Sequence, residues 1–249
     1  MPETENGSSA SRRNERFTAT HWSLVLAARG SDSTRARAAL EALCRAYWYP
    51  LYAFVRRMGQ SPHDAEDSVQ GFFAVCLEKN YLAAAEEAKG RFRSFLLLAL
   101  KRFLAKERDK SRAGKRGGGQ KPIALDGLTA EARYALEPAE HLSADKLFER
   151  RWALTLLEQV LSRLRDEQAA AGQGEAFEQL KEFLLAGGRG TPYAELAARL
   201  GTTEGAVKVA VHRLRQRYRD LLQEEIANTV ASPEEAEEER RYLLSVLSR

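Results

Sequence analysis

The stretch from residue 191 to residue 219 constrains the fold of this chain more than any other. Thr191 and Pro192 are typical of the start of a helix, since threonine can cap it and proline is favoured in its first turn. Gly201 can leave a helix with a positive φ at no steric cost, and Thr203 is placed to cap a second helix. Apolar residues then recur at helical intervals: Val207, Val211, Leu214 and Tyr218. The stretch therefore predicts two short helices joined by a tight turn.

The second of these helices has a polar side that is largely basic. Its residues recur at intervals similar to those of the apolar stripe: Glu204, Lys208, His212, Arg215 and Arg219. Two short helices, a glycine turn and a basic outer face are typical of a DNA-binding helix-turn-helix. On its own the motif indicates DNA binding and nothing more specific.

The remaining sequence predicts an all-α protein. The chain has 249 residues, enough for two small domains, and it lacks the alternating β-branched runs that would indicate strands. Residues 114–119 (GKRGGG) break the helical pattern, and residues 120–141 are poorly periodic. Such a segment is too long for an unstructured loop inside one compact domain. We therefore expect two helical domains joined by a flexible linker, the second containing the helix-turn-helix.

These patterns also set the expected boundaries. We expect a disordered leader at residues 1–16, a first helical domain at 17–113, the linker at 114–142 and the second domain at 143–230. Residues 231–249 predict an acidic C-terminal helix with an apolar edge. Two roles remain open for this helix. It could cap the second domain, or it could pack on a basic DNA-binding surface and restrain it.

The sequence contains no pattern that indicates catalysis or metal binding. Its four histidines lie far apart, and no nucleotide-binding or hydrolase motif occurs. Cys44 and Cys76 fall within apolar helical patterns, which suits buried, reduced thiols in the cytosol. The first residues do not resemble a signal peptide, and no apolar run is long enough to cross a bilayer. We expect a cytoplasmic protein that is not an enzyme, with no catalytic residues, no metal, no cofactor and no membrane insertion.

A predicted helix that starts near Pro62 has one apolar and one acidic side. The apolar side comprises Ala65, Val69, Phe72, Phe73 and Cys76. The polar side comprises Asp64, Glu66, Asp67 and Gln70. Acidic residues in a first turn can simply complement the helix dipole. The more specific interpretation is that this acidic side docks onto a basic partner.

Residues 89–121 form the most charged segment, with twelve lysines and arginines and only two acids. Phe92, Phe95 and Phe103 recur within it at helical intervals, so part of the segment is expected to fold. A basic helix with interleaved aromatic residues is suited to binding phosphates and stacking on bases. The segment therefore predicts contact with nucleic acid.

Three blocks of the chain resemble the sigma-70 family of RNA polymerase initiation factors, of the compact extracytoplasmic-function type. The first block, residues 64–79 (DAEDSVQGFFAVCLEK), resembles the family's polymerase-docking helix. The adjoining helix that opens and reads the −10 element is resembled by residues 90–113, GRFRSFLLLALKRFLAKERDKSRA. The helix-turn-helix that reads the −35 element is resembled by residues 195–215, ELAARLGTTEGAVKVAVHRLR. The blocks follow the family's order and span most of residues 40–222.

The resemblance implies a sigma factor that binds bacterial core RNA polymerase and directs promoter recognition and melting. It implies polymerase docking by Asp64, Glu66, Asp67 and Gln70. It implies contacts with the −10 element by Arg91, Phe92, Arg93, Phe95, Lys101, Arg102 and Lys106. It implies contacts with the −35 element by Thr203, Glu204, Lys208, Val209, His212, Arg213, Arg215 and Arg217. The expected partners are core polymerase, promoter DNA, and an anti-sigma factor or another regulator.

The chain departs from the family's pattern at four positions in the two DNA-contacting helices. Arg102 and Lys106 stand where an asparagine and an aspartate are common, which favours phosphate binding over base readout. Ala210 replaces a usual arginine, and Val209 a usual small polar residue. We therefore expect an altered −35 specificity.

Two other classes of function remain open. A helix-turn-helix regulator that acts without polymerase would need a dimer surface, and it would leave the acidic and basic helices unexplained. A nucleic-acid-processing enzyme would need clustered carboxylates or a metal site, and the sequence shows no pattern for either.

Overall fold

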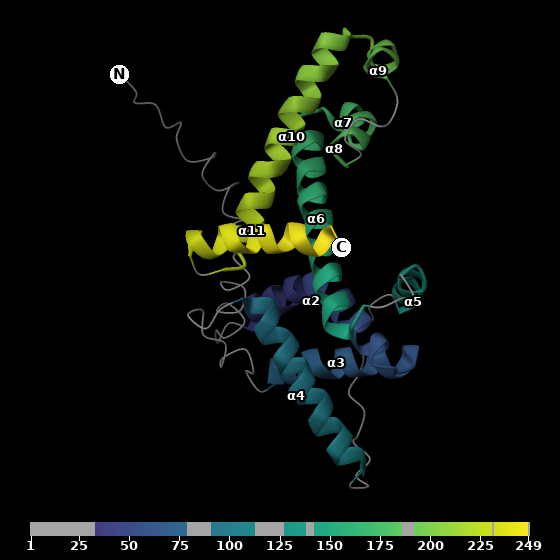
Figure 1. The fold of residues 1–249 in the computed structure, drawn as a ribbon, viewed down its shortest axis with the longest axis vertical. Helices are drawn as coiled ribbons and strands as arrows, with labels where there is room; N and C mark the ends of the chain where they lie inside the picture. The colour runs from purple at the N-terminus through teal and green to yellow at the C-terminus, as the bar shows by residue number, and fades with distance from the viewer. Residues whose placement is uncertain are drawn as a thin grey trace, which may run out of the picture. The chain divides into compact units, whose positions relative to one another are not determined.

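The computed structural model describes residues 33–78, 91–112, 127–137, 142–185, 192–230 and 232–248. Every regular element within these ranges is an α-helix, so the predicted all-α fold class is confirmed. None of these helices combines the length and apolar character needed to cross a bilayer. The predicted leader at residues 1–16 lies outside the described residues. The helices in Figure 1 are α2 (Ser33–Arg57), α3 (Pro62–Glu78), α4 (Phe92–Arg112), α5 (Gly127–Ala135), α6 (Ala144–Ala170), α7 (Gly174–Leu180), α8 (Glu182–Leu185), α9 (Tyr193–Arg199), α10 (Glu204–Ala227) and α11 (Pro233–Leu247).

The chain divides into two compact units. Unit 1 comprises Met1–Ala153 and Ile226–Arg249, and unit 2 comprises Leu154–Glu225. Both divisions fall inside long helices, α6 and α10, and not at the expected boundaries after residues 142 and 230. The buried apolar residues of α6 run from Leu147 to Leu164 without a break at the division after Ala153, so periodicity alone does not mark that division.

Unit 1 is built around α2. Its buried side chains recur at helical spacing and include Tyr47, Leu51, Phe54 and Val55. α3 packs along α2, and the predicted apolar side of α3 is confirmed, because all five of its residues are buried. Phe72 of α3 also packs against Phe103 of α4, with ring centroids 5.9 Å apart. Full burial of one such side chain stabilises the fold by about 1.5–3 kcal/mol.

α2 continues through Pro50 as a single helix. The sequence predicts either a kink or a new helix at residues 49–50, and the second alternative is wrong. Proline has no N–H to donate to the carbonyl four residues earlier, which normally weakens a helix interior. Here Tyr49, Pro50 and Leu51 are all buried, so the packing of this turn offsets the missing hydrogen bond.

Part of the predicted linker folds against α2. Glu131 of α5 accepts hydrogen bonds from the Tyr52 hydroxyl (2.5 Å) and from Nη2 (2.8 Å) and Nε (3.0 Å) of Arg56. The Arg56 guanidinium also lies over the Tyr134 ring, 4.9 Å from its centroid. Residues 127–137 therefore differ from the flexible linker expected at 114–142. Helix α5 is short, and its partners lie 75 or more positions earlier, beyond the reach of local pattern.

α11 is a capped acidic helix, as the sequence predicts. The N–H of Glu235 donates to Oγ of Ser232, the N-cap residue, over 3.3 Å. Glu239 and Leu243 are buried, and the whole helix belongs to unit 1. This differs from the first of its two expected roles, because unit 2 and not unit 1 contains α9 and most of α10.

Unit 2 has its own apolar core. Val207, Val211 and Leu214 of the predicted stripe are buried in it and Tyr218 packs against it, which confirms the stripe. The rings of Phe183 and Tyr193 stack with centroids 5.0 Å apart. The other buried members are Val160, Leu164, Phe177, Leu180, Leu196, Ala197 and Leu221.

Cys44 and Cys76 are buried free thiols, as expected. Burial raises the pKa of Cys76 to about 12, so this thiol stays protonated and unreactive at neutral pH.

We expect Glu131→Gln to destabilise unit 1 by about 0.5–1 kcal/mol, a modest cost because about a third of its side chain is exposed. Hydrogen bonds from Arg56 hold the pKa of Glu131 below its ordinary value. The stabilisation is therefore present above the ordinary pKa of a glutamate and is lost as the pH falls through the lowered pKa. Urea unfolding followed by the fluorescence of Trp48 and Trp152 should show a loss at neutral pH that shrinks in acid.

The matched control is Asp109→Asn, which neutralises an exposed carboxylate of α4. If both variants lose the same stability, or if the loss from Glu131→Gln does not change with pH, the pairing with Arg56 does not hold α5 in place.

Candidate nucleic-acid interface

The turn between α9 and α10 has well-defined geometry. Gly201 adopts a φ of 62°, in the left-handed region that favours glycine. The N–H of Thr202 donates to the carbonyl of Ala197 (2.9 Å), which is the hydrogen bond of a Schellman helix end. The hydroxyl of Thr203 accepts from the N–H of Ala206 (3.2 Å) and so caps α10. The predicted glycine turn and threonine cap are both present.

The outer side of α10 is polar and exposed. Its predicted contact residues on this side are Thr203, Glu204, Lys208, Val209, His212 and Arg213. The Lys208 ammonium lies 2.6 Å from the Glu204 carboxylate, and this interaction raises the pKa of Lys208. Arg213 makes no hydrogen bond or ion pair with the described residues. Half of the Val209 side chain is exposed, an unusual position for an apolar residue on a polar face.

Two further residues extend this outer side. Arg219 lies seven positions after His212, about two helical turns along α10, and is exposed without a partner among the described residues. Gln216 lies between them and donates to Asp220 over 2.9 Å. Periodicity placed Arg219 on the polar side, whereas Gln216 carries no charge and had no signal of its own.

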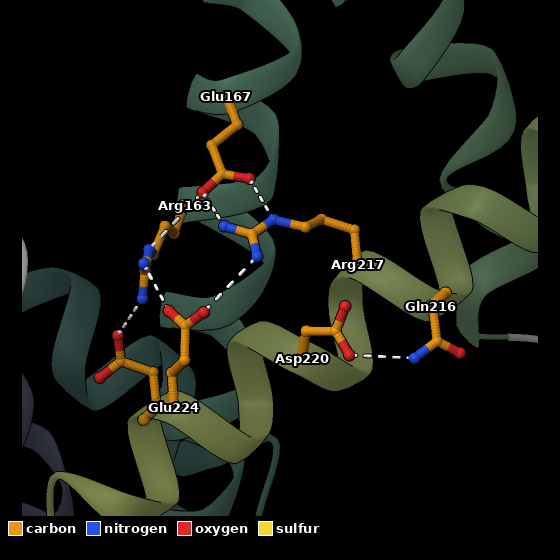
Figure 2. A network of polar contacts seen from close by, with 7 residues as sticks. Arg163, Glu167, Gln216, Arg217, Asp220 and Glu224 are labelled. Carbon is orange, nitrogen blue, oxygen red and sulfur yellow. Dashed lines mark hydrogen bonds and ion pairs between the residues drawn. The ribbon is translucent and has the colours of Figure 1, made fainter. Parts of the chain in front are cut away.

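Arg215 and Arg217 are held by unit 2 itself. Arg215 donates to the carbonyl of Phe183 from Nη2 (2.7 Å) and Nε (3.1 Å). Arg217 forms a bidentate pair with Glu167 of α6, with both distances 2.8 Å, which raises its pKa. Figure 2 shows that Arg217 and Arg163 both reach Glu167 and Glu224. Arg215 and Arg217, both predicted DNA contacts, therefore bind α10 to α8 and α6 within unit 2.

The acidic side of α3 stays open. Asp64 and Asp67 are exposed, while Glu66 and Gln70 are half-buried. Among the described residues, their hydrogen-bond and ion-pair partners lie on α3 or at its start. The Ser61 hydroxyl donates to Asp64 (2.6 Å), Gln70 donates to Glu66 (3.2 Å), and His63 lies 3.2 Å from Asp67.

α4 exposes three of its predicted contact residues, Lys101, Arg102 and Lys106. Lys101 forms an ion pair with Asp145 of α6. Arg102 and Lys106 have no partner among the described residues. Arg102 lies at the middle of α4, and Lys106 lies about one turn later on the exposed side.

Two residues in the first turn of α4, Phe92 and Arg93, are buried. Phe92 is completely inaccessible and packs edge-on against Tyr47, with ring centroids 5.4 Å apart. Phe95 is half-buried beside it, with ring centroids 6.2 Å apart. Phe92 is therefore a core residue and cannot stack on a base in this structure, which differs from its predicted role. Interleaving with basic residues did not distinguish an exposed aromatic residue from a core one.

Arg91 and Arg93 converge on one buried carboxylate of α11. Nε of Arg91 lies 2.7 Å from Oε2 of Glu239, and Nη1 of Arg93 pairs with Oε1. Arg93 is 3 % exposed and Glu239 is fully buried. Burial lowers the pKa of Arg93 to about 10, so it remains charged at neutral pH. The sequence did not identify Glu239, because it is one of several adjacent glutamates.

No group of three or more histidine, cysteine, aspartate or glutamate side chains suited to a metal occurs in the described part of the chain. The chain matches no known protein family, no curated protein and no solved structure.

We expect Arg217→Ala to destabilise unit 2 by about 1 kcal/mol, because it leaves Glu167 without its bidentate partner in a partly exposed network. Arg213→Ala should cost less than about 0.5 kcal/mol, since Arg213 makes no such contact. Thermal unfolding followed by circular dichroism, with hydrogen exchange in α6 and α10, measures the difference. Equal effects of the two changes would contradict the distinction between an internal and a free arginine.

Proposed function

We propose that this chain is a sigma factor that binds bacterial core RNA polymerase and directs it to promoters. The observation that carries the proposal is the α9–α10 pair. A Schellman turn at Gly201 and a cap at Thr203 set a helix whose apolar stripe is buried and whose outer side exposes His212 and Arg213. That arrangement suits a helix that enters the major groove of DNA. The protein acts by binding and has no catalytic step of its own.

The acidic side of α3 supports docking to polymerase. Asp64 and Asp67 are exposed, and the opposite side of the helix is committed to the core of unit 1. A basic surface on a polymerase subunit would therefore meet carboxylates that no other helix of the described chain engages. Complementary charges of this kind speed the encounter and set its orientation.

The exposed half of α4 supports contact with the −10 region. Arg102 and Lys106 would hold backbone phosphates, and Lys101 would join them if it left Asp145. Phe95 is the remaining aromatic candidate for an unstacked base, because Phe92 is in the core. Stacking can contribute about 1–3 kcal/mol per base, enough to offset part of the unpairing of a short promoter segment.

The outer side of α10 supports reading of the −35 element. Glu204, Lys208, His212 and Arg213 are the candidate base readers, with Thr203 and Arg219 toward the backbone. Arg215 and Arg217 keep α10 in place and are removed from the set of proposed DNA contacts.

In vitro transcription with purified core polymerase tests the proposal. Addition of the chain should produce discrete start sites, and mapping them identifies the promoter. DNA binding that needs no polymerase and produces no start sites would favour a regulator. Metal-dependent cleavage of the DNA would favour a processing enzyme.

We expect the double change Asp64→Lys and Asp67→Lys to weaken binding to core polymerase at least about tenfold, because it puts repulsion where attraction is proposed. Co-elution with core enzyme measures the binding. The fold should be intact, since both side chains are exposed.

The control is Glu175→Lys with Glu182→Lys, which makes the same change in net charge on exposed residues of unit 2. If the α3 variant co-elutes as the wild-type chain does, the docking surface is wrongly assigned.

We expect Arg213→Ala to cost about 1–3 kcal/mol on the mapped promoter and to relax the preference for one −35 base pair. Binding to promoter variants at that position measures it. A uniform loss on all sequences, with the salt dependence reduced by about one unit, would mean that Arg213 contacts only phosphate.

A further inference from the structure

The start of α4 is an anion site that already contains an anion. Two guanidinium groups, those of Arg91 and Arg93, meet the two carboxylate oxygens of Glu239 from α11. Glu239 is fully buried, so it has exchanged its hydration for these arginines. Glu238 stands further out, 3.8 Å from Arg91.

Aromatic rings line the same site. The Arg93 guanidinium lies over Trp152 (4.6 Å to the centroid) and over Tyr242 of α11 (4.7 Å). Arg91 lies over Tyr242 as well, at 5.4 Å. The rings hold the planar guanidinium groups in a fixed orientation, which lowers the entropy that they lose on binding an oxyanion.

This donor set suits a phosphate diester as well as a carboxylate. Paired arginines on neighbouring positions bind either oxyanion through charge-assisted hydrogen bonds. Glu149 of α6 lies close enough to interact electrostatically with Arg93. Burial raises the pKa of Glu149, which favours its neutral form. The carboxylate of Glu239 is the anion that forms ion pairs with both arginines.

We propose that Glu239 is an internal substitute for a nucleic-acid phosphate, and that α11 masks Arg91 and Arg93 until it is displaced. The inference rests on the proposed function, since it assigns regulation to the helix that we propose for −10 contact. Displacement of α11 adds two arginines to the exposed Arg102 and Lys106. The free chain therefore binds single-stranded DNA through only part of α4.

Glu239→Gln tests the masking, because it keeps the size of the side chain and removes the charge that holds the arginines. Fluorescence anisotropy with a labelled single-stranded oligonucleotide and the full chain should show about tenfold tighter binding for this variant. The salt dependence should steepen by roughly one to one and a half units, as expected for two added phosphate contacts on a single strand.

Glu234→Gln is the matched control, since it removes one charge from the same helix at an exposed position in its first turn. It should leave the affinity and its salt dependence unchanged. If the two variants bind alike, the effect of α11 is only its general negative charge, and the masking inference is overturned.

Hydrogen exchange on the wild-type chain gives a second measurement that does not depend on how well the variant folds. Saturating oligonucleotide should lower the protection of α11 amides and leave α3 unchanged. Unchanged or increased protection of α11 in the DNA-bound chain overturns the inference.

The two proposals fail separately. The anisotropy and hydrogen-exchange measurements are made without polymerase, so they do not depend on whether the chain binds it. Absence of polymerase-dependent initiation overturns the proposed function whatever Glu239 does. If the chain does initiate transcription, but Glu239→Gln does not tighten DNA binding and α11 keeps its protection, this inference alone is overturned.

Discussion

The contact between Glu239 and two arginines is the constraint that ties α11 to the start of α4 in unit 1. A charge removed from water is costly unless it is paired, and removing one partner of a buried pair costs about 3–5 kcal/mol. Glu239 therefore has to remain with Arg91 and Arg93 whenever α11 is folded on α4. This one requirement makes the end of the chain part of the same unit as the basic segment, 146 positions earlier.

The arginines of unit 2 also fall into two kinds, those whose charge is paired within the unit and those whose charge is not. Arg217 and Arg163 share the carboxylates of Glu167 and Glu224, and Arg215 satisfies a main-chain carbonyl. Their charge stabilises the packing of α10. Arg213 and Arg219 have no such partner among the described residues, so their charge faces outward. A basic sequence is therefore not the same as a basic surface, and only the second can attract DNA.

α4 shows how these two kinds of arginine can occur on one helix. In its first turn Phe92 is in the core and Arg93 is buried and paired, whereas Arg102 and Lys106 are exposed without a partner among the described residues. The proposed −10 surface thus has an open part and a closed part. The open part supports the proposed function directly. The closed part connects that function to α11, since the anion it holds comes from the protein itself.

The sequence by itself determined what is decided within a few positions of the chain. It predicted the helical class, the apolar stripe through Val207 and Val211, the Gly201 turn and the Thr203 cap, because helical periodicity and capping are local. Only the tertiary structure decided which charges are paired, that residues 127–137 fold onto α2, and that Phe92 is core. Periodicity identifies the apolar side of a helix but not the helix that covers it. The partner of a charge such as Arg93 lies far along the chain and has no local signature.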